Sequence, residues 1–506
     1  MEYIERGTIS HAYECSRPER CAAMKITIVG AGVGGLVTAL LLRRQGHEVT
    51  LYEKESQVGG CIARESNGEF SIDQGPTIVL LPHLLREILR QAGIPDEAVE
   101  LLPCDPLYDI YESDGTKWTK WRDPDKQATE IERCYRGGGS DFRRYMADME
   151  RIFDYGYEAF LSRTFVKKRA FLTLRNLAFL ARSRAYRALK PFTASYFRDP
   201  RLQDAYSLQS LYIGGAPRKA PALYGLIPYS EHRHGIWYIK GGFRHLADVL
   251  EQACRDSGVT IRCSAPVTAI HVEKGVCKGV TVAGEAALCD AVVFNGDYPM
   301  LDGILQGWRG RKKKKFRPSS GTLLIYLGVD KRWEGVGAHQ FFFPESMDYH
   351  MADLFQMGRL SVDPTFYVFN PAAIDSAAAP EGKSVLYVRV PVPASEEIDW
   401  DMAGEAVVSR VLDKAERILF PGLKQAIRWQ KVRTPRDAAR QGQYLGGSFG
   451  IAPILTQIGA FRPQVKPLGV ERLYAVGASV HPGGGVPIVM QGARLLSETI
   501  CKELGS

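Results

Sequence analysis

Residues 28–37 read "IVGAGVGGLV", a glycine run that comes directly after a short apolar stretch. Gly30, Gly32 and Gly35 form the pattern G-x-G-x-x-G. In this pattern the first glycine permits a tight turn, the second lets the backbone approach a pyrophosphate, and the third lets helix and strand pack closely. The run therefore predicts a strand at 25–30, a helix at 34–45 whose N-terminus faces phosphate groups, and a bound dinucleotide.

The residues that follow complete a βαβ unit. A second strand is predicted at 47–52, and it leads into Glu53, which stands 21 residues after Gly32. A carboxylate at this place can accept hydrogen bonds from ribose hydroxyls. A βαβ opening also predicts a parallel sheet.

Two further stretches favour a flavin over a nicotinamide dinucleotide. "EKESQVGGC" (53–61) carries the doublet Gly59 and Gly60, and a backbone that crosses the cofactor phosphates needs residues without side chains. "FSIDQGPTIV" (70–79), with Asp73, Gly75 and Pro76, is typical of the second half of a flavin-type opening.

The third piece lies near the C-terminus, where 476–493 read "VGASVHPGGGVPIVMQGA". Gly483, Gly484 and Gly485 precede a helix predicted at 486–504, and Pro487 fits its first turn. A glycine triplet lets the backbone lie against a flat ring. The positive potential of the helix N-terminus favours the negative charge of a reduced flavin.

The remaining pattern predicts an α/β fold of more than one domain. A helix is expected at 242–257 and strands at 260–263, 267–272, 279–282, 291–294 and 473–476. The dinucleotide-binding domain would be discontinuous, built from 24–110, 231–300 and 461–506. A substrate-binding and membrane-docking region would take 111–230 and 301–460. Residues 1–23 are polar and hold four glutamates, which excludes a signal or transit peptide and predicts a disordered leader or a true start at Met24.

The charge of the chain is concentrated in one segment. The net charge is +8, yet 160–198 contain no Asp or Glu and ten basic residues, so the rest of the chain carries −2. The basic residues are Arg163, Lys167, Lys168, Arg169, Arg175, Arg182, Arg184, Arg187, Lys190 and Arg198. Phe165, Phe171, Leu172, Phe179 and Leu180 stand among them, and a basic helix of this composition is expected to lie on an anionic membrane surface. A solvated basic face is the alternative, and no nucleic acid partner is expected.

Composition limits the chemistry. No stretch of about 18 uncharged apolar residues occurs, so no spanning helix is expected. The ten cysteines are scattered without a C-x-x-C pair, which favours reduced thiols in the cytoplasm over disulfides or zinc. No metal is expected.

Together the three glycine stretches resemble the flavin enzymes of the glycine-doublet amine-oxidase superfamily, and within it the bacterial phytoene desaturase family of carotenoid enzymes. The similarity runs from Met24 to the C-terminus, with 477–493 ("GASVHPGGGVPIVMQGA") close to the family's C-terminal signature. Middle segments, among them "DQGPTIVLLP" (73–82), "YIKGGF" (238–243) and "GRLSVDPTFYVFNPA" (358–372), resemble the thirty-carbon branch, the 4,4'-diapophytoene (dehydrosqualene) desaturases.

The resemblance implies a Rossmann-like FAD-binding domain and an FAD-dependent oxidoreductase of carotenoid biosynthesis. Such an enzyme introduces conjugated double bonds into a linear polyene by hydride transfer to flavin and proton loss. Electrons would then pass to a quinone or to oxygen, at the inner face of the cell membrane. The alternatives are a forty-carbon phytoene desaturase, a terminal-methyl oxygenase or a carotene isomerase. A lipid-binding escort protein without redox activity and an amine oxidase, which needs an aromatic cage, are disfavoured.

The resemblance also implies the residues that contact FAD. They are Gly30, Gly32, Gly34, Gly35, Glu53, Gly60, Val267, Gly477, Ala478, Gly484, Gly485 and Val486. Cys61 stands where the family usually has Arg, which predicts weaker FAD retention unless Arg64 compensates. No catalytic base is assigned. His481 is a candidate for a catalytic role or for holding the glycine loop, and Arg163 for a place near the substrate path or at the surface.

Overall fold

The computed structural model describes residues 23–308 and 314–504, so the predicted leader lies outside the described residues except for its last one. Within this range the glycine run joins the central strand of a five-stranded parallel sheet to a helix. The sheet has the order β20-β13-β1-β2-β9. Its strands are β1 (Lys25–Val29), β2 (Glu48–Tyr52), β9 (Thr260–Arg262), β13 (Ala291–Phe294) and β20 (Leu473–Ala475). The predicted strands 25–30, 47–52, 260–263, 291–294 and 473–476 therefore exist and pair in parallel.

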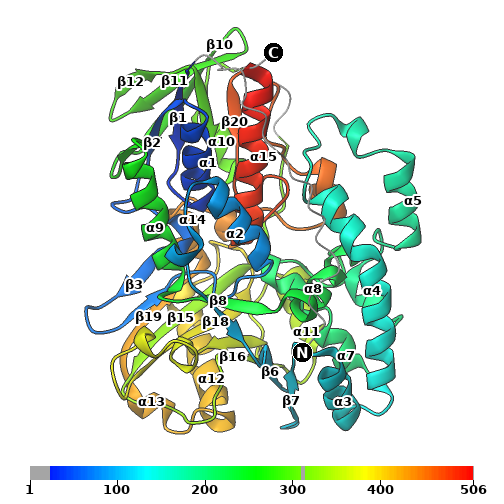
Figure 1. Cartoon of the computed structure of the whole chain (residues 1–506). Helices are drawn as coiled ribbons and strands as arrows, with labels where there is room; N and C mark the ends of the chain where they lie inside the picture. The colour runs from blue at the N-terminus through cyan, green and yellow to red at the C-terminus, as the bar shows by residue number, and fades with distance from the viewer. Residues whose placement is uncertain (1–22, 309–313, 505–506) are drawn as a thin grey trace.

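Three helices pack on this sheet. They are α1 (Val33–Arg44), α9 (Gly242–Asp256) and α15 (Val486–Leu504). α1 and α15 lie side by side in the upper half of Figure 1, although they stand at opposite ends of the sequence. A four-stranded sheet, β12-β11-β10-β14, adjoins this unit. Its strands are β10 (Val267–Glu273), β11 (Val276–Val282), β12 (Glu285–Leu288) and β14 (Leu305–Gln306).

A mixed seven-stranded sheet occupies the lower half of the molecule (Figure 1), in the order β19-β15-β18-β17-β16-β6-β7. Its strands are β6 (Tyr108–Tyr111), β7 (Lys117–Lys120), β15 (Gly321–Val329), β16 (His339–Phe342), β17 (Phe366–Phe369), β18 (Ser384–Val392) and β19 (Ile427–Arg433). Alternation along β18 separates its two faces. Leu386, Val388 and Val390 pack with α12 (Trp400–Ile418), whereas Val385 and Tyr387 join the core that continues into the parallel sheet.

Shorter elements complete the chain. Two small ribbons pair β3 (Arg64–Ser66) with β4 (Ser71–Asp73) and β5 (Leu101–Cys104) with β8 (Ile236–Ile239). The other helices are α2 (Pro82–Gln91), α3 (Pro124–Cys134), α4 (Gly138–Phe160), α5 (Leu174–Arg182), α6 (Leu189–Thr193), α7 (Pro200–Ala205), α8 (Leu226–His234), α10 (Leu301–Ile304), α11 (Met347–Ala352), α13 (Leu423–Ala426) and α14 (Pro435–Arg440). Among the described helices, none combines the length and the apolar character that a bilayer span requires.

The basic segment 160–198 contains more than one helix. It folds into α5 and α6 with loops between them. α5 ends because Arg184 adopts the left-handed conformation, with φ of 53°, and the backbone N–H of Ala185 returns to the carbonyl of Leu180. This is a common way to end a helix, and it turns the chain back toward the protein.

Candidate functional site

The first glycine loop is built for close backbone approach. Gly30 has φ of 102°, and a Cβ on Gly35 would lie 2.1 Å from the carbonyl oxygen of Gly30. The side-chain amide of Asn295, just after β13, donates to that same carbonyl at 3.0 Å. Gly32 caps α1 without a side-chain hydrogen bond, so the first N–H groups of the helix are free to meet an anion.

Glu53 is fixed beside this loop. Only 7% exposed, its carboxylate accepts the backbone N–H of Ala31 at 2.7 Å and that of Glu55 at 3.0 Å. Each carboxylate oxygen keeps a further lone pair for a ribose hydroxyl. The backbone N–H of Ala265 donates to the carbonyl of Glu53 at 2.8 Å, which brings the start of β10, and with it Val267, next to the acid.

The glycine doublet lies against the first loop. The backbone N–H of Gly59 donates to the carbonyl of Ala31 at 2.9 Å. Gly60 has φ of 56°, and a Cβ there would lie 3.2 Å from Cα of Gly32. The two segments thus form one continuous surface of backbone without side chains.

The C-terminal loop reaches the same place from β20, which is separated from β1 by β13 in the sheet. Val476 donates its N–H to the carbonyl of Phe294, so Gly477 and Ala478 follow the end of β20 beside the end of β13. α15 begins at Val486, directly after Gly484 and Gly485. A Cβ on Gly34 would lie 3.0 Å from Cγ1 of Val489, so α1 and α15 can approach this closely only at a glycine.

The structure brings the twelve sequence-predicted residues to one edge of the parallel sheet. The edge offers open backbone at three glycine stretches, an uncapped helix N-terminus and a buried acid. A dinucleotide with a flat ring requires these three features, so the residues present fit FAD. Among the residues with described side chains, no cluster of His, Cys, Asp or Glu could hold a metal ion.

Arg64 does not replace the arginine missing at position 61. Its guanidinium donates to the carbonyl of Gly241 at 2.7 Å and lies 3.8 Å from Asp73. Asp73 in turn accepts the N–H of Phe243 at 2.5 Å, at the start of α9. Cys61 is exposed, and its Sγ accepts the side-chain amide of Gln443 at 3.4 Å. Arg64 therefore positions the start of α9 in this structure.

His481 lies inside the C-terminal loop and is 3% exposed. Its Nε2 donates to the carbonyl oxygen of Arg163 at 2.9 Å, and its ring packs on Phe165. Burial lowers the pKa of His481 to about 4, so the ring is neutral at physiological pH. These contacts are those of a histidine that holds the loop to the segment after α4. The guanidinium of Arg163 is at the surface and pairs with Glu158 at 2.9 Å.

The sequence did not indicate a group of side chains on the seven-stranded sheet. They face the edge of the parallel sheet that carries the twelve predicted residues, which we call the cofactor edge. Arg389 on β18 stands between Tyr367 and Phe449, with its guanidinium carbon 5.6 Å and 5.7 Å from the two ring centres. The hydroxyl of Tyr367 lies 2.9 Å from Oγ1 of Thr77, in the second half of the flavin-type opening. The signal in the sequence was one arginine inside the otherwise apolar strand "SVLYVRVPV".

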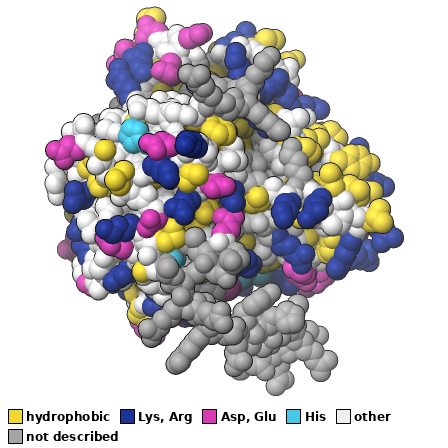
Figure 2. Space-filling model, turned by 90° about the horizontal axis from the view of Figure 1, so that it is seen from above, with side chains coloured by type: hydrophobic (Ala, Val, Ile, Leu, Met, Phe, Trp, Pro, Cys, Tyr) yellow, Lys and Arg dark blue, Asp and Glu magenta, His cyan; other side chains and the backbone are white. Residues whose placement is uncertain are grey.

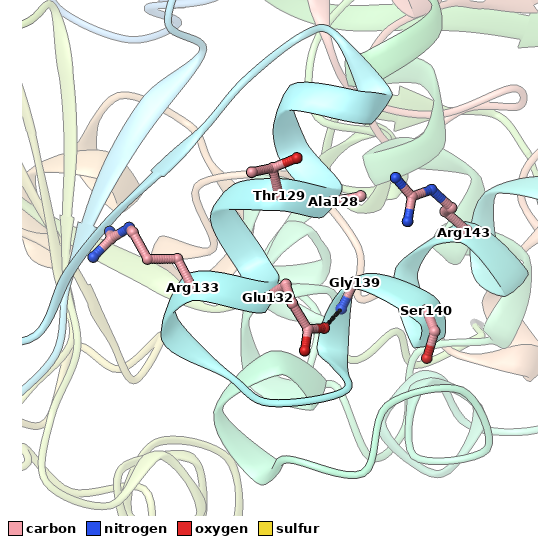
Figure 3. Close-up of a pocket in the computed structure, with 7 residues that line it drawn as sticks. All are labelled: Ala128, Thr129, Glu132, Arg133, Gly139, Ser140 and Arg143. Atoms are coloured by element: carbon pink, nitrogen blue, oxygen red, sulfur yellow. Dashed lines mark hydrogen bonds between the residues drawn. The ribbon is translucent and has the colours of Figure 1, made fainter.

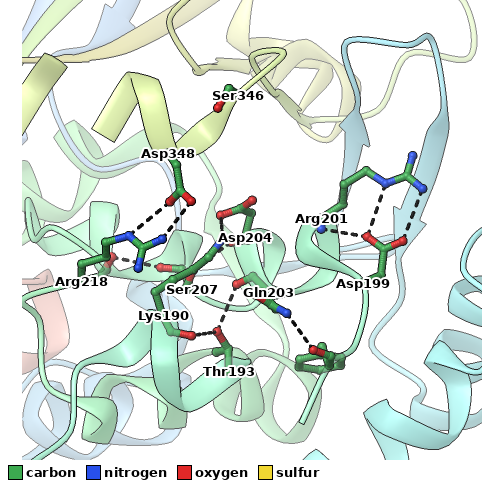
Figure 4. Close-up of polar contacts among 12 residues, drawn as sticks. Lys190, Thr193, Asp199, Arg201, Gln203, Asp204, Ser207, Arg218, Ser346 and Asp348 are labelled. Carbon is green, nitrogen blue, oxygen red and sulfur yellow. Dashed lines mark hydrogen bonds and ion pairs between the residues drawn. The ribbon is translucent and has the colours of Figure 1, made fainter. Parts of the chain in front are cut away.

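The basic segment forms a mixed apolar and cationic surface. Exposed apolar side chains are Val166, Leu172, Leu174, Leu177 and Tyr186, and most of the basic side chains named above are exposed beside them. Figure 2 shows hydrophobic and basic side chains together on the side where α5 lies in Figure 1. Not all of the expected members lie at the surface. Phe165 is buried, Phe171, Phe179 and Leu180 are partly buried against the same cluster, and Lys190 is buried against Asp204 (Figure 4).

A separate hollow of about 530 Å³ lies between α3 and α4 (Figure 3). Glu132 on its wall accepts the N–H groups of Gly137 and Gly139. Arg133 and Arg143 on its rim pair with Glu130 and Asp125. Its charged groups are therefore paired within the protein, and none of its lining residues is among the twelve predicted to contact FAD.

Comparison with known proteins agrees with this geometry. A profile described as "Flavin containing amine oxidoreductase" matches residues 33–500. A cyclohexylamine oxidase from Brevibacterium oxydans has the same fold, with a TM-score of 0.64 at 13% identity over 96% of this chain and 100% of that one.

Three curated relatives align over nearly the whole chain. A 4,4'-diapolycopen-4-al dehydrogenase from Metabacillus indicus is 44% identical over 95% of this chain and 97% of its own length. A zeta-carotene-forming phytoene desaturase from Myxococcus xanthus is 34% identical over 94% and 93%. A 4,4'-diaponeurosporene-forming 4,4'-diapophytoene desaturase from Staphylococcus aureus is 30% identical over 95% and 99%. The chain therefore belongs to the flavin-containing amine oxidoreductase family and, within it, to the FAD-dependent carotenoid desaturases.

Proposed function

We propose that this protein desaturates a linear thirty-carbon polyene in carotenoid biosynthesis. The observation that carries the proposal is the meeting of two surfaces, the three-part glycine edge that fits FAD and the aromatic face of the seven-stranded sheet opposite it. Bound FAD supplies the two-electron acceptor. The polypeptide holds an apolar chain against the ring and keeps water away, because charge that develops on carbon is delocalised into the polyene.

FAD would be held by the residues that line this edge. The diphosphate would be held by Gly30, Gly32, Gly34, Gly35 and Gly60, the ribose by Glu53, and the adenine by the backbone of Val267. The ribityl chain and the ring would be held by Gly477, Ala478, Gly484, Gly485 and Val486. The backbone geometry at Gly35 and Gly60 and the two hydrogen bonds that orient Glu53 support this assignment.

The proposed substrate length of thirty carbons is inferred from the names of relatives. The Staphylococcus aureus and Metabacillus indicus proteins are named for diapo-type carotenoids, whereas the Myxococcus xanthus protein is named for phytoene. An amine substrate is disfavoured, since Arg389 already places a positive charge between Tyr367 and Phe449, where an ammonium ion would be repelled.

Substrate delivery would come from the membrane. Leu172, Leu174 and Leu177 can enter the interface while the arginines around them face anionic headgroups, each contributing about 1 kcal/mol. The protein would then act at the cytoplasmic face of the cell membrane as a peripheral enzyme, with a quinone or oxygen as the final electron acceptor.

A second candidate reaction is oxidation of a polyene aldehyde to the acid, and the 44% identical aldehyde dehydrogenase favours it. Water would add to the aldehyde carbon, and the resulting gem-diol would lose one proton to solvent and one hydride to the two-electron acceptor that FAD would supply. The products are the carboxylic acid and reduced flavin, so atoms and electrons balance.

An anaerobic assay separates the two reactions. Purified FAD-loaded protein is mixed with anionic liposomes that contain either the thirty-carbon polyene hydrocarbon or a polyene aldehyde of the same length. Bleaching of flavin absorption with the hydrocarbon, together with longer-wavelength polyene bands, supports desaturation. Bleaching only with the aldehyde supports the second candidate, and bleaching with neither contradicts both.

A further inference from the structure

Arg389 is the exception on an otherwise apolar and aromatic surface. It lies in the middle of β18, where every other residue is buried and uncharged. Its neighbours in register are Leu324 on β15 and Tyr367 on β17. Because side chains alternate along a strand, Arg389 shares the face of Val385 and Tyr387, which is the face turned toward the cofactor edge.

The guanidinium has no anionic partner in the described part of the chain. No carboxylate there forms an ion pair with it, its guanidinium lies over two aromatic rings, and its Nε is buried without a hydrogen-bond partner. Arg433 on the neighbouring strand β19 shows the contrast, because its Nε and Nη2 both donate to Gln441. A buried donor without an acceptor is costly, and a bound oxygen would offset that cost.

The place of Arg389 points to the reacting end of a ligand. The carbonyl oxygen of Phe449 lies 3.8 Å from the Cβ position of Gly484, in the glycine triplet before α15. Tyr367 contacts Thr77 on the other side. A hydrocarbon offers no acceptor to a guanidinium, so the oxygen that Arg389 could bind has to come from a polar end of the ligand. An aldehyde, its hydrate or a carboxylate would be stabilised.

We propose that Arg389 binds the oxygen of an oxygenated polyene end, an aldehyde or a carboxylate, beside the flavin ring. The inference rests on the proposed function, since it takes a polyene as the ligand. It makes Arg389 a specificity-determining residue that adds affinity for a polyene with a polar end and leaves the affinity for the hydrocarbon unchanged.

Binding by the FAD-loaded protein tests this directly. The probes are a linear thirty-carbon polyene with one terminal carboxylate and the hydrocarbon of the same length, each followed by its absorption shift and by quenching of protein fluorescence. We expect Arg389→Met to weaken binding of the acid about 10- to 100-fold and to leave binding of the hydrocarbon unchanged. Arg389→Lys should fall between. The matched control is Arg428→Met, an exposed arginine of the same sheet that pairs with Asp330.

Each other outcome overturns the proposal in a recognisable way. Equal loss of both probes, or no loss, excludes recognition of the oxygen by Arg389. Loss of FAD absorption in Arg389→Met, with Arg428→Met normal, makes the cofactor the partner of the guanidinium. If the wild-type protein binds neither probe, the polyene function itself fails, and the inference fails with it.

Discussion

The carboxylate of Glu53 accepts the backbone N–H of Ala31 at 2.7 Å, which ties the acid at the end of β2 to the glycine loop after β1. One residue thereby holds the loop and presents a negative charge at the cofactor edge. Its second oxygen accepts the N–H of Glu55, so the orientation of the carboxylate is set before any ligand arrives.

Replacing Glu53 by Gln is expected to weaken FAD binding about 10- to 100-fold, because hydrogen bonds to a charged acceptor are stronger than those to an amide. Titration of the apoprotein with FAD, followed by flavin fluorescence, measures the change. Glu55→Gln removes the same charge from an exposed neighbour and should leave the affinity unchanged. Equal affinities in all three proteins would remove Glu53 from the FAD site.

Gly35→Ala is expected to destabilise the fold by about 1–3 kcal/mol or more, since the added Cβ would lie 2.1 Å from the carbonyl oxygen of Gly30. Thermal unfolding and the flavin content of the purified protein report the effect. Gly303→Ala in α10 meets no atom within 4 Å and serves as the control. An unchanged unfolding midpoint in Gly35→Ala would show that the βα turn is not as tight as described.

Replacing a leucine of α5 by aspartate, in Leu174→Asp or Leu177→Asp, should reduce binding to anionic liposomes about tenfold. Each variant loses apolar burial in the membrane and adds a negative charge that the anionic lipids repel. Leu174 is 88% exposed at the first position of the helix, where an acid is compatible with folding. Leu288→Asp on β12, 81% exposed, is the matched control. Liposome co-sedimentation at low and high salt measures binding, and an equal loss in Leu288→Asp would rule out α5 as the docking surface.

Stability should fall as the pH drops from 6.5 toward 4. Burial lowers the pKa of His481 to about 4, below its value in the unfolded chain, so the unfolded state takes up a proton in this window and the folded state does not. The stabilisation is complete above about pH 6.5 and is lost on acidification. His481→Gln, which keeps a donor for the carbonyl of Arg163, should flatten the pH dependence of the denaturant midpoint. A parallel pH profile would assign the effect to other buried histidines.

The cofactor edge could be predicted because its geometry is local. Glycines at 30, 32 and 35, an acid at 53 and a triplet before a helix each impose a conformation on a few residues, and β13 and α15 fall at 291–294 and 486–504 as expected. The substrate face could not be predicted in this way. Arg389 meets Phe449 only because β18 and the loop after β19 fold together, and no spacing in the sequence encodes that contact.

The course of the basic segment could be predicted only in part, for a similar reason. Its composition indicated an exposed surface. However, Arg184 adopts the left-handed conformation and ends α5, and Phe165 is buried in contact with His481. Lys190 forms a buried pair with Asp204, which lies beyond the acid-free stretch (Figure 4). Charge counting over a window does not detect partners outside it.

Pigment formation tests the central claim most directly. The chain is co-expressed in a carotenoid-free bacterium with a synthase that makes either the thirty-carbon or the forty-carbon precursor, and the extract is examined by absorption spectroscopy. Desaturation of a thirty-carbon polyene predicts new visible bands with the shorter precursor, at wavelengths that count the conjugated double bonds. Colour with the longer precursor only would contradict the chain length, and a colourless extract with both precursors, from cells that hold flavin-loaded protein, would contradict desaturation.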